Sequence, residues 1–241
     1  MHILHRIRKR DEGKSLAYCS EEPSVIDRRE MLVGGALLAA LPSPAGAALP
    51  VPPGDRLGFD VIRNGSKLGM HVLTFERSGD NLVVRVAVEL VFKAAFVTLY
   101  RYRHRAVETW SGDQVVGLET STDDDGKKFS VTGRRDSRGL VIEGTALPRF
   151  VAPATASPAT HWNRRQLDGP WINTQDGKIY RPKVSQQGQD AIPTVAAGSI
   201  RANHYALSGD VDLDLWYDGR PTWAGLSFKG KDGSLIRYVR Q

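Results

Sequence analysis

The sequence predicts an all-β protein: a single antiparallel meander that forms a strongly curved or closed β-barrel. Short runs of alternating apolar and polar residues, rich in Val, recur through residues 57–239, and this period-2 pattern is typical of half-buried strands. The breaks between the runs carry Gly, Asn or Asp, the residues of tight hairpin turns. No amphipathic stretch of helical length follows Leu41, so no long helix is expected in the folded domain.

Residues 1–47 are predicted to be a twin-arginine-type signal peptide with its own helix. Arg28 and Arg29 directly precede an apolar run from Met31 to Leu41. At about 11 residues, this run suits the apolar region of a signal and is too short to span a bilayer. The alternative is a general secretory signal that happens to contain an arginine pair.

The alanines at positions 45 and 47 form an A-x-A-type cleavage site (Ala45, Ala47). We therefore expect a mature domain over residues 48–241, with no stable membrane span after cleavage. The twin-arginine translocase is the expected partner during export. The expected location is the periplasm, as a soluble exported protein.

The first half of the domain predicts a series of hairpins. Asn64-Gly65 is the strongest short hairpin signal, and Asp123-Asp124-Asp125-Gly126 is interpreted as another turn. A calcium loop is the alternative there, but the twelfth position falls on Thr132 instead of the glutamate that such a loop needs. The expected strands are 59–63, 67–76, 82–92, 96–110, 115–122, 127–133 and 140–143.

A change of composition separates the two halves. Residues 148–158 are rich in Pro, Ala, Thr and Ser, which predicts a connector across the surface or across the barrel mouth. Residues 160–167 are expected to form at most one short helix. Strands then resume, and they are expected at 171–174, 178–185, 200–208, 211–217, 222–228 and 235–239. A sheet of about a dozen strands tends to curl, so we expect one domain.

Composition narrows the possible functions only moderately. The 241 residues carry 33 Lys and Arg against 27 Asp and Glu, a formal charge of +6. This balance favours anionic partners such as a lipid or another amphipathic anion. Basic residues are not interleaved with aromatics over a long block, so no nucleic acid is expected as a partner.

No metal site or cofactor is predicted. The single cysteine, Cys19, lies before the apolar run, so the mature domain has no thiolate for a metal site or for nucleophilic catalysis. Its four histidines lack the spacing of zinc ligands. Neither a G-x-S-x-G motif nor a phosphate-binding glycine loop is present. The histidines are His71, His104, His161 and His204.

Several segments resemble DUF6134, a family of exported bacterial proteins that carry a domain of unknown function. The resemblance covers residues 57–238 and implies a barrel-like β fold and an envelope location, but no activity. The matching residues are 59–65 with Gly69 and His71, 100–105 with Glu108 and Trp110, 122–126, 161–163 and 215–218.

The segment from Tyr100 to Trp110 is the strongest candidate for a ligand-binding strand. Residues two apart share a face of a strand, so the arginines lie on one face and the tyrosines with His104 on the other. A cationic stripe beside aromatics suits a carboxylate, phosphate or sulfate group. The alternative is that the arginines face outward and pair with acidic neighbours. Together with two residues after the connector, the speculative site is Tyr100, Arg101, Tyr102, Arg103, His104, His161 and Trp162.

Two further expectations concern the surroundings of this strand. Asp210, Asp212 and Asp214 share one face, and we hypothesise that this aspartate stripe pairs across strands with the arginine stripe. The segment 161–163 is either a plug that caps the barrel with Trp162 or an ordinary loop.

Three functions remain open. The first is a non-enzymatic periplasmic binding or envelope-associated protein for an apolar or amphipathic ligand, which predicts a concave apolar pocket of at least about 300 Å³. The second is a hydrolase-like enzyme, which predicts a histidine–carboxylate hydrogen bond inside a cleft. The third is a protein–protein scaffold, which predicts an exposed apolar patch.

Overall fold

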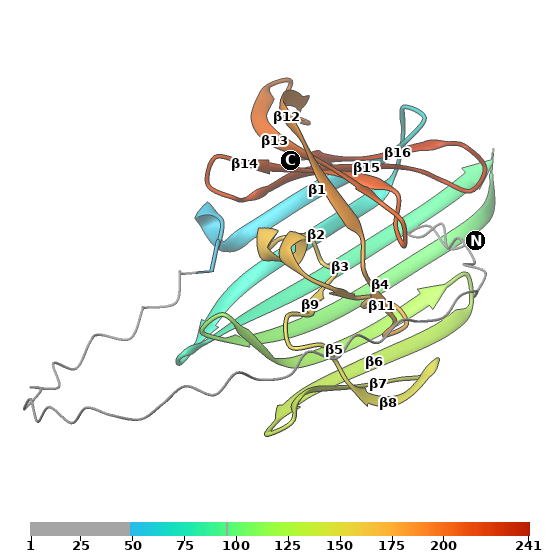
Figure 1. The fold of residues 1–241 in the computed structure, drawn as a ribbon. Coiled ribbons are helices and arrows are strands. Elements are labelled where there is room, and N and C mark those ends of the chain that lie inside the picture. Colours follow the sequence, from blue (N-terminus) through green and yellow to red (C-terminus); the bar gives the residue numbers. More distant parts are fainter. Residues whose placement is uncertain (1–48, 95) are drawn as a thin grey trace, which may run out of the picture. The chain divides into compact units, whose positions relative to one another are not determined.

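The computed structural model describes residues 49–94 and 96–241, and the predicted signal peptide lies outside these residues. The described chain is almost entirely β (Figure 1), which confirms the predicted fold class. One sheet has thirteen strands in the order β12 (Lys183–Pro193), β13 (Ser199–Ser208), β14 (Leu213–Asp218), β15 (Trp223–Lys229), β16 (Leu235–Arg240), β1 (Arg56–Arg63), β2 (Ser66–Ser78), β3 (Asn81–Ala94), β4 (Val97–Ser111), β5 (Gln114–Asp124), β6 (Lys127–Asp136), β7 (Gly139–Gly144) and β8 (Leu147–Val151).

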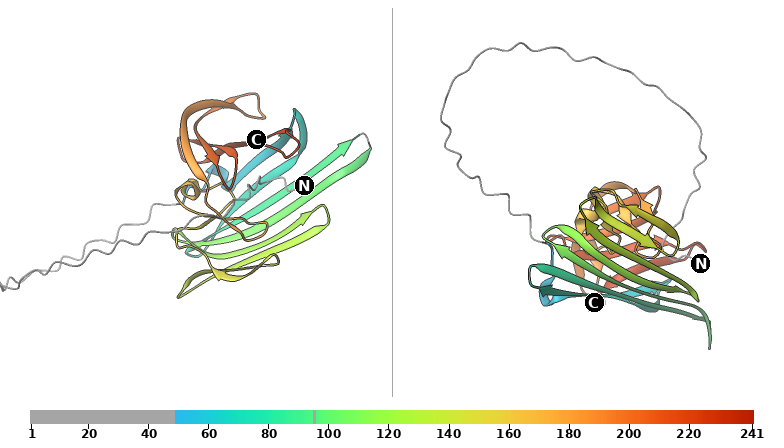
Figure 2. Two further views of the ribbon diagram at one scale, coloured as in Figure 1. Left: turned by 45° about the vertical axis from the view of Figure 1, so that its right-hand side comes forward. Right: turned by 90° about the horizontal axis from the view of Figure 1, so that it is seen from below.

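The order of the strands shows which strands of the meander pair with each other and which two strands form the edges of the sheet. The last strand, β16, pairs with the first, β1, in antiparallel register, so both ends of the folded chain lie inside the sheet. The two edges are β8 and β12, which are not neighbours in the sheet. The sheet is therefore strongly curved but open (Figures 1 and 2), and the expectation of a closed barrel is not met.

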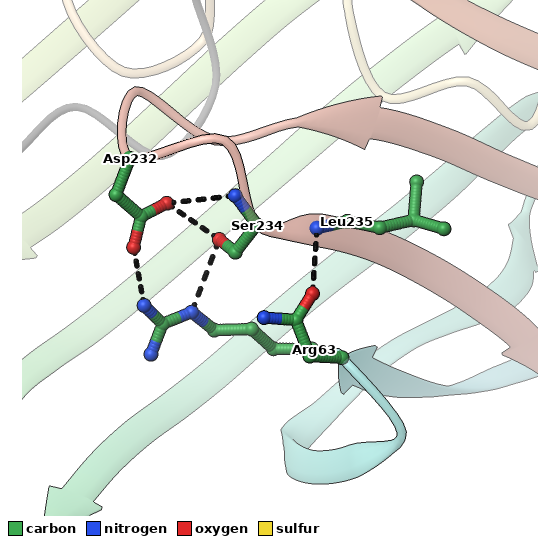
Figure 3. Close-up of polar contacts among 5 residues, drawn as sticks. Arg63, Asp232, Ser234 and Leu235 are labelled. Atoms are coloured by element: carbon green, nitrogen blue, oxygen red, sulfur yellow. Dashed lines mark hydrogen bonds and ion pairs between the residues drawn. The ribbon is translucent and has the colours of Figure 1, made fainter.

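Arg63 fastens the seam between β1 and β16 at one end (Figure 3). Its guanidinium forms an ion pair with Asp232 in the β15–β16 turn, and its Nε donates to Ser234 Oγ at 3.1 Å. The same guanidinium lies 4.0 Å from the ring centre of Phe92 on β3, within the range of a cation–π interaction. The Asn64 side chain accepts from the backbone N–H of Leu235 at 2.9 Å. The first and last hairpins are thus held together at their turns.

Residues 152–182, here called the plug, run along the concave side of the sheet. They contain β9 (Ser157–Pro158), the short 3₁₀ helix η2 (Arg164–Asp168), β10 (Trp171–Ile172) and β11 (Ile179–Tyr180). These three strands form a small second sheet in which β9 and β10 are parallel. Trp162, Trp171 and Ile172 are fully buried. The plug interpretation of residues 161–163 therefore describes their position better than an exposed loop does.

The predicted connector is partly wrong. Residues 147–151 form the edge strand β8, where Pro148 is tolerated because an edge strand leaves one side of its backbone unpaired. Residues 157–158 are buried in the plug sheet instead of crossing the surface. The short helix expected at 160–167 is observed as η2, whose first turn is capped by the Asn163 side chain.

Residues 183–208, here called the arm, form the β12–β13 hairpin. The sequence predicts a strand only up to Ser185, whereas β12 continues to Pro193. The tip of the arm reaches back to β16, where Val195 N–H donates to the Arg240 carbonyl at 2.9 Å. Ile192 lies over Gly225 on the outer face of β15, so that a Cβ at Gly225 would be 3.1 Å from Ile192 Cδ1. The arm therefore curls over the convex face of β14–β16.

In addition, η1 (Pro53–Asp55) precedes β1. No helix among the described residues has the length and apolar character needed to cross a bilayer.

Candidate functional site

The speculative site is divided between the two faces of β4. Tyr100, Tyr102 and His104 are buried on the concave face, as their alternation predicts. Arg101 and Arg103 are exposed on the convex face. The structure therefore does not bring the arginines together with the aromatic residues, because the sheet itself separates them.

The hypothesis of paired arginine and aspartate stripes is wrong. Strand β4 pairs with β3 and β5, whereas β14, which carries Asp214, pairs with β13 and β15. Arg105 forms an ion pair with Glu89 on β3 at 2.6 Å. Asp210 accepts from the backbone N–H of Arg181 at 2.7 Å. Sequence alternation shows which face a residue occupies but does not identify the neighbouring strand.

Glu108 joins β4 to the plug. It is fully buried, and its carboxyl group contacts Trp110 Nε1 at 2.7 Å, Trp162 Nε1 at 3.0 Å and Thr160 Oγ1 at 2.5 Å. Burial raises the pKa of Glu108, although these hydrogen bonds act in the opposite direction. Trp162 also packs edge-on against Phe75 and Trp110. This cluster fixes the plug and contains no exposed reactive atom.

Three of the four histidines gather in the interior. His71 on β2, His104 on β4 and His161 in the plug are buried and line one pocket together with Tyr102, Thr174 and Gln175. The ring nitrogens of His104 share hydrogen bonds with the hydroxyl groups of Thr122, at 2.8 Å, and Thr174, at 3.2 Å. Both ring nitrogens of His71 lack a hydrogen-bond partner among the described residues.

The surroundings keep His71 and His104 uncharged. Burial lowers the pKa of His104 to about 4. Burial also places the pKa of His71 well below its usual value, and the nearby rings of His161 and His104 lower it further. His71 and His104 thus line the histidine pocket as neutral groups and offer no charge to an anion.

The histidine pocket does not reach the size expected of a ligand site. The histidine pocket has a volume of about 30 Å³, far below the range of about 300–1,000 Å³ that is typical of small-molecule sites. Around this pocket, two indoles of the plug, Trp162 and Trp171, and the indole of Trp223 on β15 are fully buried. The histidine pocket is therefore too small for the ligand predicted on the concave face, whereas a second space of about 350 Å³ lies between the plug and the β4–β5 turn, lined by Trp110, Arg135 and Asn163 among others.

A cleft of suitable size lies on the convex face instead. Here called the arm cleft, it measures about 320 Å³ between the arm and strands β14–β16. Ile192 and Pro193 of the arm form one wall, and Trp216, Leu235 and Val239 of the sheet contribute apolar surface. Gly225 pairs with both Trp216 and Val239 across the strands, and its missing side chain leaves room under Ile192.

Two polar side chains lie together on one side of the arm cleft. Ser227 on β15 and Arg237 on β16 are directly opposite in the register, and both line the cleft. Arg237 is exposed and takes part in no ion pair within the part of the chain that the structure describes. The arm cleft therefore combines apolar walls with one available guanidinium.

A histidine clamp holds the arm at its base. His204 Nε2 lies 2.8 Å from Asp214 Oδ1 on β14, and His204 Nδ1 lies 3.1 Å from Asp190 Oδ2 on β12. Trp216 Nε1 donates to the same Asp190 oxygen at 2.8 Å and stacks on the His204 ring. These contacts fix the indole that forms a wall of the arm cleft.

The hydrolase-like alternative gains no support from these histidines. It predicts a histidine–carboxylate hydrogen bond inside a cleft, whereas His204 forms such bonds beneath the arm, where they join β12 to β14. In the interior, His104 contacts threonine hydroxyls. Because these hydroxyls occupy both ring nitrogens of His104, no carboxylate among the described residues orients this ring.

Sequence reasoning missed the arm cleft and all its residues. The signal was weak because residues 186–190 carry no apolar side chain. The exposed strand β12 has almost no buried face and therefore shows no alternation. Trp216 and Arg237 lie on the outward face of predicted strands, where alternation assigns them to solvent. Gly225, at the centre of a strand, was the available signal, because glycine in a strand often marks a close approach of another segment.

Comparisons with known proteins support the fold. The profile of DUF6134, described as a domain of unknown function, matches residues 59–241. Among solved structures, the chain is similar to a beta-barrel-like protein of the domain of unknown function DUF1849 from Brucella abortus, with a TM-score of 0.55 and 10% identity over 77% of this chain and 94% of that chain. At this identity the similarity concerns the fold alone. Among curated proteins, none matches the sequence.

Proposed function

Since the chain belongs to the DUF6134 family, a domain of unknown function, we propose its function from geometry: it is a non-enzymatic binding protein of the bacterial periplasm for an amphipathic anion. The ligand occupies the arm cleft. Its apolar part lies between Ile192, Trp216 and Val239, and its anionic group faces Arg237. The observation that carries the proposal is a cleft of about 320 Å³ beside a guanidinium that forms no ion pair with any described residue.

The chemistry of the walls supports this class of ligand. Apolar surface dominates the lining, and burial of a hydrocarbon chain is favourable by roughly 0.8 kcal/mol for each CH₂ group. A guanidinium binds a carboxylate, phosphate or sulfate through paired N–H donors, and the Ser227 hydroxyl on the opposite strand can add another donor. An uncharged hydrocarbon would pack against the apolar walls of the arm cleft but would form no ion pair with Arg237.

Decanoate and decanol together test the proposal, because they share a hydrocarbon chain and differ in charge. We expect the wild-type protein to bind decanoate more tightly than decanol in isothermal titration calorimetry. Arg237→Gln should weaken decanoate binding about three- to tenfold, as expected for one charge-assisted hydrogen bond at an open site. Decanol binding should not change.

Two further variants complete the test. Ser227→Tyr places a ring on the cleft wall and should weaken both ligands by competing for the same space. Arg201→Gln removes an exposed arginine of the arm that does not line the cleft, and it should change neither affinity. Equal binding of decanoate by wild type and Ser227→Tyr would show that the ligand does not occupy the arm cleft.

A further inference from the structure

The turn between β3 and β4 carries an apolar surface that the fold does not use. Phe96 is 102% exposed, Val97 62% and Leu99 52%, although the concave face of the same hairpin is buried up to Leu90 and Tyr100. We call Phe96, Val97 and Leu99 the apolar tip. Clustered exposure of large apolar side chains on a folded domain marks an interaction surface.

The apolar tip protrudes instead of lining a groove. The β3–β4 hairpin extends past the neighbouring turns at its end of the sheet (Figure 2). The hairpin is held firmly behind the tip, because Arg63 stacks on Phe92 and Tyr100 Oη donates to the buried Asp124 at 2.5 Å. A convex apolar projection fits a soft apolar layer better than it fits a preformed protein pocket.

Cations surround the base of the apolar tip. Lys93, Arg101 and Arg103 are exposed on the same hairpin and form no ion pair among the residues that the structure describes. Lys127 and Lys128 follow the adjacent β5–β6 turn, which is fixed beside the tip by the hydrogen bond from Asp125 N–H to the Arg101 carbonyl. Three acidic neighbours lie in the β5–β6 turn: Asp123 binds Lys128 and the Gly126 N–H, Asp124 is buried and accepts from Tyr100, and Asp125 accepts from the Arg101 backbone N–H, so they are fewer than the five cations. The excess charge around the tip is therefore positive.

We propose that the apolar tip docks the protein on an anionic lipid bilayer. Phe96, Val97 and Leu99 enter the boundary between the headgroups and the acyl chains, and Lys93, Arg101 and Arg103 contact the anionic headgroups. Basic and apolar side chains acting together are the combination that binds proteins to the surface of such membranes. The tip lies on β3–β4 and does not share residues with the arm cleft, so the two proposals stand separately.

Vesicle sedimentation tests this docking with defined probes. We expect the protein to sediment with phosphatidylcholine vesicles that contain phosphatidylglycerol, and much less with phosphatidylcholine alone. The triple variant Phe96→Ser, Val97→Ser and Leu99→Ser should lower the apparent affinity at least about tenfold. The control Val151→Ser with Val184→Ser removes two exposed valines from the sheet edges and should leave the affinity unchanged.

The charges are tested in the same way. Lys93→Gln, Arg101→Gln and Arg103→Gln should each lower the affinity for anionic vesicles about fivefold at low salt. The control pair Arg77→Gln and Arg134→Gln removes the same type of charge from the other end of the strands. If the control pair lost as much affinity for anionic vesicles, binding would depend on net charge alone. The proposed role of the tip would then be wrong.

A label at position 96 measures insertion directly and does not depend on how well the serine variants fold. Cys19 is the only cysteine of the chain, so a Cys19→Ser, Phe96→Cys protein takes a single environment-sensitive fluorophore. The emission should shift to the blue with phosphatidylglycerol vesicles, whereas the same label at Val184→Cys should not respond. If the protein sediments and the label at position 96 stays in water, the proposal is wrong. If no vesicle binds, the tip belongs to a protein partner and the proposal is also wrong.

Discussion

At the scale of single residues, the buried carboxyl group of Glu108 can stabilise the fold through its charge or through its hydrogen bonds, and substitutions separate these two roles. Two indole N–H groups converge on Glu108 Oε2, and Thr160 contacts Oε1. Because burial raises the pKa of Glu108, the protonated form is favoured in the folded protein relative to the unfolded chain. A protonated Oε1 can donate to Thr160, whereas an ionised Oε1 accepts from the Thr160 hydroxyl, and in both forms Oε2 accepts from the two indoles.

The hydrogen bonds of Glu108 predict losses of stability of different size for two substitutions. Glu108→Gln keeps one acceptor for the indoles and one donor for Thr160, and should lower the free energy of unfolding by less than about 1 kcal/mol. Glu108→Leu leaves two indole donors and a hydroxyl without a partner and should cost about 2–5 kcal/mol. Urea denaturation at pH 7 measures both. An equally large loss in both variants would mean that the carboxylate is ionised in the fold.

The interior histidines predict the response to acid. The folded-state pKa of His71 and of His104 lies below the usual value of 6.5, so the unfolded chain binds protons first. Their contribution to stability is present above pH 6.5 and is lost as the pH falls, for His104 toward about 4. Protonation of the His104 site should lower the free energy of unfolding by roughly 2 kcal/mol between pH 7 and pH 5, and His71 should act in the same direction.

Removing one of these histidines should flatten the pH profile. His71→Phe keeps a ring beside Phe59, Trp223 and Tyr238, and it removes two nitrogens that have no hydrogen-bond partner among the described residues. Urea midpoints at pH 7 and pH 5 should therefore differ less in this variant than in the wild type. An unchanged difference between the two midpoints would contradict the neutral state of His71.

At the scale of elements, Gly69 sets how closely β2 and β3 approach each other. A Cβ at this position would lie 1.9 Å from the Glu89 backbone oxygen, and β3 is held in place by ladders on both sides. Gly69→Ala should therefore cost about 3 kcal/mol or prevent folding. Gly117→Ala is the matched control, because its Cβ would meet only the Thr109 side chain at 3.3 Å. Thermal unfolding of both variants tests this prediction. A small loss of stability in Gly69→Ala would be evidence against the close packing of β2 on β3.

The strands that sequence predicts well are those with one buried face and a turn of defined chemistry. Asn64 and Gly65 have positive φ angles of 46° and 87°, as the predicted tight hairpin requires. Asp125 and Gly126, at 52° and 90°, form the predicted hairpin turn between β5 and β6. Local chemistry therefore determined these elements without knowledge of the rest of the fold.

The elements that sequence misses lack such local signals. Strand β8 contains Pro148, and the second half of β12 is exposed on nearly every residue. The strand order is not local at all: the pairing of β1 with β16 joins residues that are far apart in the chain. For the candidate site, alternation placed Tyr102 and His104 correctly on the face opposite Arg101. It did not reveal the arm cleft, because that cleft depends on where the arm folds back.

At the scale of the whole described domain, the plug joins the two halves of the open sheet. Trp162 packs on Phe75 of β2 and Trp110 of β4. On the other side, Gln166 Nε2 donates to Tyr217 Oη of β14 at 2.6 Å, and the same hydroxyl donates to the His161 carbonyl at 2.8 Å. The open edges β8 and β12 therefore do not make the halves independent, since both bind the same segment.

This shared plug predicts a single cooperative transition. Far-UV circular dichroism, which follows the sheet, and near-UV circular dichroism, which follows the packed indoles, should give the same midpoint in urea. Trp162→Ala should shift both midpoints together and cost about 3–5 kcal/mol. Trp216→Ala, on the convex face, should shift them much less because it does not contact the plug. If Trp162→Ala abolished the near-UV signal while the far-UV midpoint stayed unchanged, the sheet would be stable without its plug, and the plug would be an accessory layer.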